Sequence, residues 1–510
     1  MSAPVPRDLL LAPQLAPDAV ARLLAAYGFR DLRAADANLQ QIAADPLLRT
    51  LLADIVDELL FCLKRSPDPD LALARFERFV AASLGPRELF ASLKGSPLTL
   101  ELITRVFGAS PFMAEILIRN PGDLYWITDP AVLGARRTKQ ALARGLKAAL
   151  LPFRTDEKRL DLLRLFKRRE LLHIGVRDLL RRATVEETLA ALSELAEVLI
   201  EAACTITGGG AGRAVIGLGK LGGGELNFSS DVDLMYVHSE ARGRPSVEPH
   251  ETAARRLTAA LGASTNEGHV FRVDLRLRPE GRLGSLTHSI PSLRRYYAAR
   301  GRTWERLALI KARPVAGDKR LGARMVEAVR GFVYDPPFDD AAFAAVRRLK
   351  EPIDAKMRSR GEDATNVKLG AGGIREIEFT VQALQARHGR DDARLRRPGT
   401  MEALAALREA GHVAAAEHDA LADAYLFLRD VENKLQMASD AQVHAIPRDD
   451  AARLTLARTL GYGGDEDADP ARTFLSDLAR RTTAVRAIFD RMFPAALTDA
   501  PAAEPSAPEE

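Results

Sequence analysis

Two aspartates separated by one residue, Asp231 and Asp233, stand where a glycine-rich segment gives way to an apolar one in GLGKLGGGELNFSSDVDLMYVH. Side chains two residues apart on a β-strand point to the same face, so we expect the two carboxylates to converge. Mg²⁺ takes oxygen ligands and keeps waters and substrate phosphates in its remaining positions, so a few carboxylates suffice to hold it. The pair therefore predicts a Mg²⁺ site. The alternatives are a turn-capping pair or a Ca²⁺ loop, and an EF-hand is disfavoured because its regularly spaced ligands ending in glutamate are missing.

A third carboxylate, Asp274, lies in FRVDLRLRP, where alternation places it on the same strand face as Arg272 and Arg276. A plain ion pair is one interpretation. Beside a pair of aspartates the arrangement also fits phosphoryl-type chemistry, in which metal ions bridge phosphates, arginine stabilises the spreading charge and a carboxylate accepts a proton. We therefore predict Asp231, Asp233 and Asp274 as both metal ligands and catalytic residues.

The glycines before the aspartates spell GxGxxG at Gly217, Gly219 and Gly222, which is the pattern of a dinucleotide-binding turn. In that fold the third glycine opens a long helix, and GGGELNFSSD is too short and too rich in glycine, asparagine and serine to form one. A P-loop is excluded too, because its first glycine and the Ser or Thr after its lysine are missing. We interpret the segment as a loop whose backbone approaches phosphate oxygens closely. The predicted nucleotide- and phosphate-binding residues are Gly219, Lys220, Gly222, Gly223, Ser229, Ser230, Arg276, Arg278 and Arg375. For Lys220, a solvated loop lysine is an equally good interpretation.

Two later segments have polar side chains that could belong to a site. Arg375 follows the glycines of KLGAGGIREIEF at a predicted loop-to-helix junction, where a helix N-terminus can receive phosphate. The alternative is an ordinary helix start whose glutamates suit the helix dipole. A polar stripe at helical spacing comes further on: Arg429, Glu432, Asn433 and Gln436. Such a stripe is usually solvated, and only contact with the catalytic domain would make it a wall of the site.

The elements predicted around the aspartates form a small sheet domain. Residues 214–217 and 232–238 are predicted strands, joined by a tight loop and paired antiparallel. Residues 251–261 are a predicted helix and residues 270–278 a third strand. Thr400 is the predicted N-cap of a later helix.

Leu and Ala recur at helical spacing on both sides of this sheet, so the predicted fold class is mostly α with an embedded α+β domain and helical bundles before and after it. The predicted domains are an N-terminal helical region at 1–95, a helical region leading into the catalytic domain at 96–205, the catalytic domain at 206–332, a helical bundle at 333–495 and a disordered tail at 496–510. The tail is rich in Ala, Pro and Glu and cannot bury enough apolar surface to order itself.

Composition excludes several classes of protein. The 510 residues carry a net charge of only +4 with 6% aromatics, so no one-sided basic footprint for nucleic acid is present. The two cysteines, Cys62 and Cys204, form no CxxC motif, which argues against a disulfide framework or a zinc site. The sequence shows no signal-peptide pattern and no apolar run long enough for a membrane span. We therefore expect a cytoplasmic protein that contacts neither nucleic acid nor membrane.

Several long segments occur in the order found in one known family: GLGKLGGGELNFSSDVDLMYVH, VDLRLRPEGRLGSL, WERLALIKARPVAGD, KLGAGGIREIEFTVQ and VENKLQMASDAQVHAIP. Over residues 110–447 the chain resembles the bacterial glutamine synthetase adenylyltransferase/adenylyl-removing enzyme family. The resemblance implies a DNA polymerase β-like nucleotidyltransferase domain, with Asp231, Asp233 and Asp274 as its metal-binding and catalytic carboxylates. Full-length members carry two such catalytic halves, and this chain resembles the amino-terminal half, which removes AMP by phosphorolysis.

The activity implied by the resemblance is Mg²⁺-dependent transfer or removal of AMP at a tyrosine of glutamine synthetase, with ATP, or phosphate and ADP, as substrates or products. A PII-type signal protein and a separate carboxy-terminal-half adenylyltransferase are further candidate partners. Two other hypotheses stay open: a regulatory module that binds glutamine synthetase or PII and only senses nucleotide, and a nucleotidyltransferase with another target. The intact set of three aspartates favours an enzyme over the regulatory module.

Overall fold

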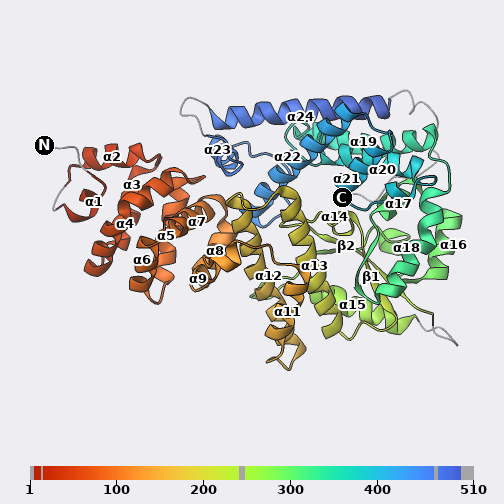
Figure 1. Cartoon of the computed structure of the whole chain (residues 1–510), viewed down its shortest axis with the longest axis horizontal. Helices are drawn as coiled ribbons and strands as arrows, with labels where there is room; N and C mark the ends of the chain where they lie inside the picture. Colours follow the sequence, from red (N-terminus) through yellow and green to blue (C-terminus); the bar gives the residue numbers. More distant parts are fainter. Residues whose placement is uncertain (1–4, 13–14, 241–246, 464–468, 495–510) are drawn as a thin grey trace. The chain divides into compact units, whose positions relative to one another are not determined.

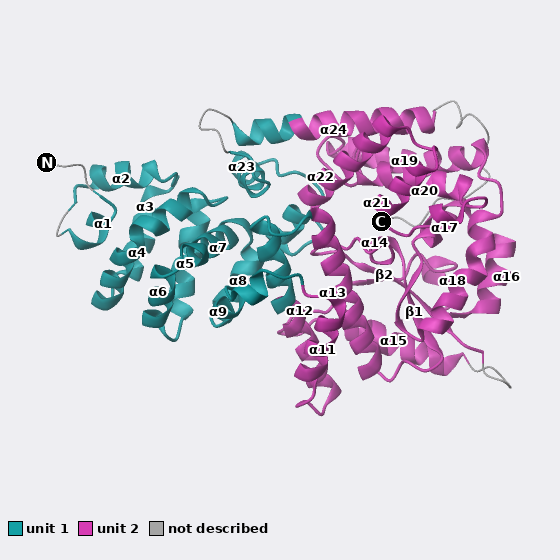
Figure 2. Cartoon of the chain, in the orientation of Figure 1, with its two compact units in different colours: residues 1–136, 169–184, 433–476 teal, residues 137–168, 185–432, 477–510 magenta. Residues whose placement is uncertain are grey.

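The computed structural model describes residues 5–12, 15–240, 247–463 and 469–494. The predicted tail at 496–510 lies outside them. The chain is mostly helical with one small sheet (Figure 1), as predicted. It divides into two compact units (Figure 2): unit 1 contains residues 1–136, 169–184 and 433–476, and unit 2 contains residues 137–168, 185–432 and 477–510.

Unit 1 consists of helices. Its elements are α1 (Asp8–Leu11), α2 (Pro17–Ala26), α3 (Leu32–Ile42), α4 (Pro46–Lys64), α5 (Pro69–Ala82), α6 (Pro86–Lys94), α7 (Pro97–Ala109), α8 (Pro111–Arg119), α9 (Asp123–Ile127), α10 (Pro130–Leu133) and α23 (Asp450–Thr459). Helices α4, α5, α7 and α8 each begin with a proline, and the Asp or Ser before it accepts a hydrogen bond from a backbone amide of the first turn. Proline suits this position because its fixed φ is helical and it has no amide hydrogen to satisfy. The core includes Phe79 of α5 packed edge-on against Phe107 of α7, with ring centroids 5.6 Å apart.

Unit 2 contains the sheet and the helices around it. Its helices are α11 (Lys139–Leu150), α13 (Val185–Ile206), α14 (Gly219–Gly223), α15 (Glu248–Gly262), η1 (Gly281–Leu283), α16 (Ile290–Arg300), α17 (Thr303–Ile310), α18 (Lys319–Tyr334), α19 (Asp340–Arg360), α20 (Ile374–His388), η2 (Ala393–Leu395) and α21 (Thr400–Glu409). Three more helices contribute residues to both units: α12 (Asp156–Leu179), α22 (Ala415–Ser439) and α24 (Pro470–Met492).

The sheet has five strands: β1 (Arg213–Gly217), β2 (Val232–His238), β3 (Val273–Asp274), β4 (Thr287–Ser289) and β5 (Arg313–Gly317). Strand β1 pairs antiparallel with β2 on one side and with β5 on the other. On its far side β2 pairs in parallel with β3 near its beginning and with β4 near its end. The predicted antiparallel pairing of the first two strands is therefore confirmed.

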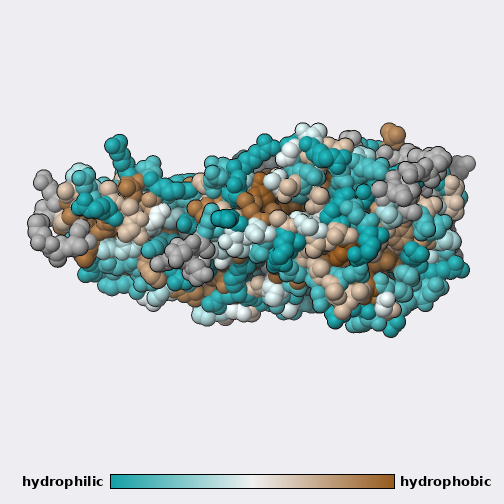
Figure 3. Space-filling model, turned by 90° about the horizontal axis from the view of Figure 1, so that it is seen from above, coloured by the Kyte–Doolittle hydropathy of each residue, from teal (hydrophilic) through white to brown (hydrophobic). Residues whose placement is uncertain are grey.

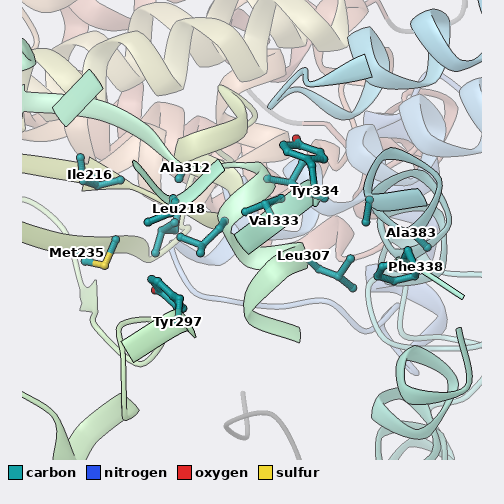
Figure 4. Packing of buried hydrophobic residues seen from close by; sticks show 14 of the residues in the cluster. Ile216, Leu218, Met235, Tyr297, Leu307, Ala312, Val333, Tyr334, Phe338 and Ala383 are labelled. Carbon is teal, nitrogen blue, oxygen red and sulfur yellow. The ribbon is translucent and has the colours of Figure 1, made fainter. Parts of the chain in front are cut away.

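Alternation along these strands gives the sheet two buried faces. On one face Ile216 and Met235 belong to a hydrophobic core with Tyr297 of α16, Leu307 of α17 and Val333 of α18 (Figure 4). On the other face the Tyr236 hydroxyl is 2.8 Å from the hydroxyl of Thr258 on α15. Helices on both sides therefore fix the positions of the strand ends, where the polar residues lie.

Two local predictions were wrong. The strand expected at 270–278 is only the two residues of β3, because the Asp274 side chain accepts a hydrogen bond from the Arg276 amide (2.8 Å) and turns the chain. Thr400 is not an N-cap, because α21 begins with it and Gly399 precedes it as the cap residue. Its hydroxyl is instead bonded to Glu225, as described with the site.

Hydrophilic residues cover most of one face of the molecule (Figure 3), and both cysteines are buried. Figure 3 shows one face of the molecule with hydrophilic residues over most of it and hydrophobic residues in small groups. No helix among the described residues combines the length and apolarity that crossing a membrane requires. Cys62 and Cys204 are both buried free thiols, and burial raises the pKa of each to about 11.

Candidate active site

The three predicted aspartates are brought together by the pairing of β2 with β3. Asp233 and Asp274 are direct partners in the parallel register, so their side chains leave the same face of the sheet side by side. Asp231 stands two residues before Asp233, just before β2 begins. The same face continues into the hydrophobic core at Met235. The sheet therefore presents three carboxylates at the point where its apolar face ends.

Asp231 and Asp274 are each paired with an arginine, Asp231 with one from the neighbouring segment and Asp274 with one from its own. Arg272 Nε donates to Asp231 Oδ1 at 2.6 Å, and Arg276 Nε donates to Asp274 Oδ2 at 2.8 Å. Arg272 also donates to the backbone carbonyl of Ser229 at 2.5 Å, which fixes the turn before the aspartates. Arg272 and Arg276, which alternation places on the strand face of Asp274, thus both lie at the carboxylates.

Arg278 has different partners. Its guanidinium is buried and donates to the backbone carbonyls of Leu275 (2.7 Å) and Ser285 (3.1 Å). It therefore holds the loop between β3 and β4 in shape. A phosphate contact for Arg278 stays a prediction.

The predicted metal ligands fit a divalent cation in donor type and in register. Within the described ranges, however, no group of three or more His, Cys, Asp or Glu side chains is arranged to hold a metal ion. Asp231 and Asp274 each accept a hydrogen bond from an arginine. The Arg272–Asp231 pair has side chains 39% and 30% exposed and contributes only about 0–1 kcal/mol, so rotating Asp231 toward a cation costs little. The Asp274 side chain is only 14% exposed. Mg²⁺ binding by these residues stays a prediction.

The glycine segment between β1 and β2 contacts the aspartates directly. Gly219 has φ +49°, and a side chain there would collide with the carboxylate of Asp233, whose Cγ would be 3.1 Å from the added Cβ. The Leu218 amide donates to the Asp233 carbonyl at 2.9 Å. Glycine at 219 is therefore required both by the backbone conformation and by the closeness of the Asp233 carboxylate.

Gly222 and Gly223 have packing roles in addition to the predicted phosphate contact. A Cβ on Gly222 would lie 2.7 Å from the carbonyl oxygen of Gly217 and would also collide with the carbonyl of Lys311. The Gly222 amide already donates to the Leu218 carbonyl at 2.8 Å. A Cβ on Gly223 would be 3.2 Å from the carbonyl oxygen of Pro398. These glycines let the short helix α14 lie against neighbouring backbone.

We expect Gly222→Ala to destabilise the protein by about 1–3 kcal/mol, since the added methyl meets backbone atoms that cannot move aside independently. Urea unfolding followed by circular dichroism measures this. Gly210→Ala is the matched control, because a Cβ at Gly210 has no atom within 4 Å. Equal midpoints for the two variants would contradict the packing role.

Ser229 and Ser230 shape the turn that leads to Asp231. Both are buried. The Ser230 hydroxyl accepts a hydrogen bond from the Asn227 amide at 3.2 Å. Their predicted role toward phosphate stays a prediction.

Lys220 is not the solvated loop lysine that one interpretation proposed. Its Nζ donates to Glu432 Oε1 at 2.7 Å, and its side chain is 13% exposed. Burial lowers the pKa of Lys220 to about 8, against the opposing effect of Glu432. Asn227 Nδ2 donates to the other oxygen of the same carboxylate, Glu432 Oε2, at 2.6 Å.

The polar stripe on α22 is buried and contacts the segment between β1 and β2. Arg429 and Glu432 are both fully buried, and Arg429 donates to the Glu225 carbonyl and to Asn227 Oδ1. Asn433 and Gln436, the other members, are buried too. From the sequence, the stripe would form a wall of the site only if it touched the predicted catalytic domain. Arg429 and Glu432 make such contacts with residues of that predicted domain.

A second buried cluster, which the sequence did not reveal, surrounds Lys311. Lys311 Nζ donates to Glu378 (2.8 Å), to Glu225 (3.1 Å) and to the Thr400 hydroxyl (3.2 Å). The Glu225 carboxylate also accepts the amide of Thr400 at 2.5 Å. Glu225 and Lys311 each lie in one of the segments that carry the family resemblance, but their pairing across 86 residues leaves no local signal in the sequence.

Arg375 belongs to this second cluster. It lies near the start of α20, one turn before Glu378, and its guanidinium is 5.5 Å from the ring centre of Phe379. Burial alone would raise the pKa of Glu378, but the charges of Lys311 and Arg375 bring it down to about 2. A phosphate contact for Arg375 stays a prediction.

The low pKa of Glu378 predicts a pH dependence of stability. A carboxylate with a folded pKa of about 2 and an ordinary value of 4.5 stabilises the fold above pH 4.5 and loses that contribution as the pH falls toward 2. We therefore expect the stability difference between wild type and Glu378→Gln to shrink steadily from about pH 5 to pH 3. Urea unfolding at each pH measures it, and a difference that is constant over this range would contradict the assignment.

A small pocket lies at the other end of β1 and β2, away from the aspartates. It is lined mostly by apolar atoms of the sheet, α13 and α15. At its rim the His238 and His250 rings stack 4.5 Å apart, and Arg213 Nε donates to His250 Nδ1 at 3.1 Å. His238 is five residues from Asp233 along β2, or about 16 Å. The pocket is therefore separate from the carboxylates.

Comparison with known proteins identifies two regions of the chain. Residues 100–328 match the family model described as glutamate-ammonia ligase adenylyltransferase, and residues 346–493 match the one described as GlnD PII-uridylyltransferase. The first region contains the sheet and all three aspartates, and the second contains α20, α21 and α22.

Individual relatives carry one shared description, bifunctional glutamine synthetase adenylyltransferase/adenylyl-removing enzyme. A protein of Thioalkalivibrio sulfidiphilus is 40% identical over 418 residues, covering 78% of this chain and 42% of the relative. Relatives from Streptomyces avermitilis and Pseudomonas aeruginosa are 34% and 37% identical, covering 93% and 71% of this chain and 47% and 39% of their own lengths. The chain thus spans less than half the length of these relatives.

Proposed function

Because the chain belongs to the bacterial glutamine synthetase adenylyltransferase/adenylyl-removing enzyme family, we propose that it transfers or removes AMP at a tyrosine of glutamine synthetase. The observation that carries the proposal is the pairing of Asp233 with Asp274, with Asp231 and Gly219 beside them. Within the proposal, the sheet of unit 2 is a DNA polymerase β-like nucleotidyltransferase domain. The resemblance to the amino-terminal half of the family favours removal of AMP by phosphorolysis.

The proposed reaction is an in-line displacement at the α-phosphorus of the adenylyl group. In the removing direction an oxygen of inorganic phosphate forms the new bond to phosphorus, and the bond to the tyrosyl oxygen breaks. The tyrosyl oxygen takes up a proton, and the products are ADP and unmodified tyrosine. In the adding direction the tyrosyl oxygen attacks the α-phosphorus of ATP, and pyrophosphate leaves.

The residues of the site have separate tasks in this reaction. Asp231, Asp233 and Asp274 would hold Mg²⁺, which neutralises phosphate charge and orients the reacting oxygens. Arg272 and Arg276, released from the carboxylates, can stabilise the negative charge that spreads over the equatorial oxygens. Gly219 lets the backbone approach Asp233 without a side chain between them.

The partners are proposals of the same kind. Glutamine synthetase is the proposed protein substrate, on the strength of the relatives' shared description. A PII-type signal protein is the proposed regulator, because residues 346–493 match a model described as a PII-uridylyltransferase. A separate adenylyltransferase half stays a candidate partner.

One assay tests the proposed activity. The purified chain is incubated with AMP-modified glutamine synthetase, phosphate and Mg²⁺, and ADP release is followed. We expect ADP from wild type and a strongly reduced rate from Asp231→Ala. No ADP release, with wild type equal to Asp231→Ala, would rule out the removing direction, and the same pair with ATP and unmodified glutamine synthetase tests the adding direction.

A further inference from the structure

We propose that Glu432 of α22 is a positioning residue that clamps both ends of the connection between β1 and β2 and so sets the geometry of the carboxylate site. The inference rests on the proposed function for what the site binds. The contacts that form the clamp are tested without measuring turnover.

The Glu432 carboxylate accepts hydrogen bonds from two residues of the connection between β1 and β2. Glu432 Oε1 accepts from Lys220 Nζ at 2.7 Å, and Glu432 Oε2 accepts from Asn227 Nδ2 at 2.6 Å. Lys220 stands three residues after β1 ends, and Asn227 stands five residues before β2 begins. The two bonds therefore fix the entry and the exit of the connection relative to a single side chain.

Arg429 holds the same carboxylate and the same segment. Its Nε is 3.4 Å from Glu432 Oε2, and its Nη1 donates to the Tyr425 hydroxyl at 2.9 Å. It also bonds the Glu225 carbonyl and the Asn227 side-chain oxygen. Arg429 is thus oriented by its own helix and makes the Glu432 carboxylate part of a network rather than a single pair.

The energetics of burial favour a role in geometry over one in stability. Taking the charges of Lys220 and Glu432 out of water costs about as much as their attraction returns, and apolar residues of similar volume usually stabilise a core at least as well. Hydrogen bonds are directional, so they fix the relative positions of the groups that they join, which apolar contacts do not. A clamp that specifies the position of a loop is a use for which a buried carboxylate is suited.

The clamped segment carries the residues that touch the site. Gly219, next to Lys220, lies against the Asp233 carboxylate. Ser229, two residues after Asn227, accepts a bond from Arg272, the partner of Asp231. Loosening the segment therefore displaces two of the three proposed metal ligands, although Glu432 touches neither.

The clamp joins two regions that match different family models. Lys220 and Asn227 lie in the region matched at 100–328, and Glu432 lies in the region matched at 346–493. The helices after the sheet are therefore more than a separate bundle, since one of them completes the wall of the site. Anything that shifts this part of α22 is expected to change the site.

Hydrogen–deuterium exchange of the full chain tests the clamp. Glu432→Gln keeps the size of the side chain and removes its charge, and Asp423→Asn on the same helix is the matched control, because Asp423 is 54% exposed and pairs with Arg481. We expect about 10-fold faster exchange in residues 218–231 of Glu432→Gln, equivalent to a local loss of about 1.4 kcal/mol. Exchange equal to that of Asp423→Asn would overturn the clamp, as would faster exchange spread through all of unit 2.

A double-substitution cycle separates the clamp from two independent effects. Lys220→Gln and Glu432→Gln are measured singly and together by the same exchange. If the pair acts as one unit, the double variant exchanges no faster than the faster single variant. If the increase in exchange rate of the double variant equals the product of the two single increases, the two residues act independently and the proposal is overturned.

Mn²⁺ titration followed by electron paramagnetic resonance tests the positioning of the carboxylates. We expect Glu432→Gln to bind Mn²⁺ about 10–100-fold more weakly than Asp423→Asn, the range seen when groups that orient metal ligands are removed. Unchanged Mn²⁺ affinity together with faster exchange would overturn the positioning role. If wild type binds no Mn²⁺, yet Glu432→Gln still exchanges faster than Asp423→Asn, the proposed metal site is overturned and the clamp stays in place.

Discussion

Asp233→Asn is expected to lower the rate of AMP removal or transfer by about 10²–10³-fold, the loss typical when one preorganised electrostatic group leaves an active site. Asparagine keeps the shape of the side chain but brings no charge to the pair formed with Asp274. Because the substitution leaves the register of β2 and β3 in place, the loss should appear in kcat rather than in stability. Steady-state kinetics of ADP release, with thermal unfolding of the same sample, measure both.

The control for this substitution is Asp340→Asn, the same change at an exposed position in the first turn of α19. It should retain wild-type kinetics. If Asp233→Asn and Asp340→Asn were equally active, the carboxylates on β2 and β3 could not be the catalytic centre. A metal requirement is tested in the same assay, since chelation should abolish the wild-type rate and added Mg²⁺ should restore it.

The strand that carries this prediction was foreseeable from the sequence. The predicted strand at 232–238 corresponds to β2, because a strand buried on both faces leaves a nearly continuous apolar run in the sequence. The antiparallel pairing with β1 followed from the shortness of the connection. The convergence of Asp233 with Asp274 is set by the parallel register of β2 and β3, which no short segment encodes.

The third strand shows where pattern reading fails. FRVDLRLRP alternates as a strand should, yet only Val273 and Asp274 pair. Asp274 bonds the amide of Arg276, and the chain turns. Aspartate often competes for nearby backbone amides in this way, and alternation alone does not show which aspartate will do so.

The buried polar residues were the least predictable part of the site. The sequence of a polar stripe such as Arg429 and Glu432 does not show whether its side chains face water or bind residues about 200 positions away in the chain. Lys220 was assigned either to phosphate or to solvent, and its partner in the structure is Glu432. Helical periodicity reports which residues share a face, but not what covers that face.

Lys311→Met is expected to lower the free energy of unfolding by about 3–5 kcal/mol, the loss typical when one partner of a buried ion pair is removed. Methionine occupies similar volume, so the effect is electrostatic rather than a cavity. The variant leaves the Glu225 and Glu378 carboxylates buried without their shared cation. Urea unfolding measures the change.

Lys319→Met is the matched control eight residues later. The Lys319 side chain is 48% exposed and its nearest acid, Glu201, is 3.8 Å away, so the same substitution should cost about 0–1 kcal/mol. Adding Glu378→Gln to Lys311→Met should recover part of the stability, because it neutralises one of the stranded carboxylates. A Lys311→Met midpoint equal to that of Lys319→Met would mean that the cluster is hydrated. Glu225 and Thr400 would then not tie α21 to the segment that precedes Asp231.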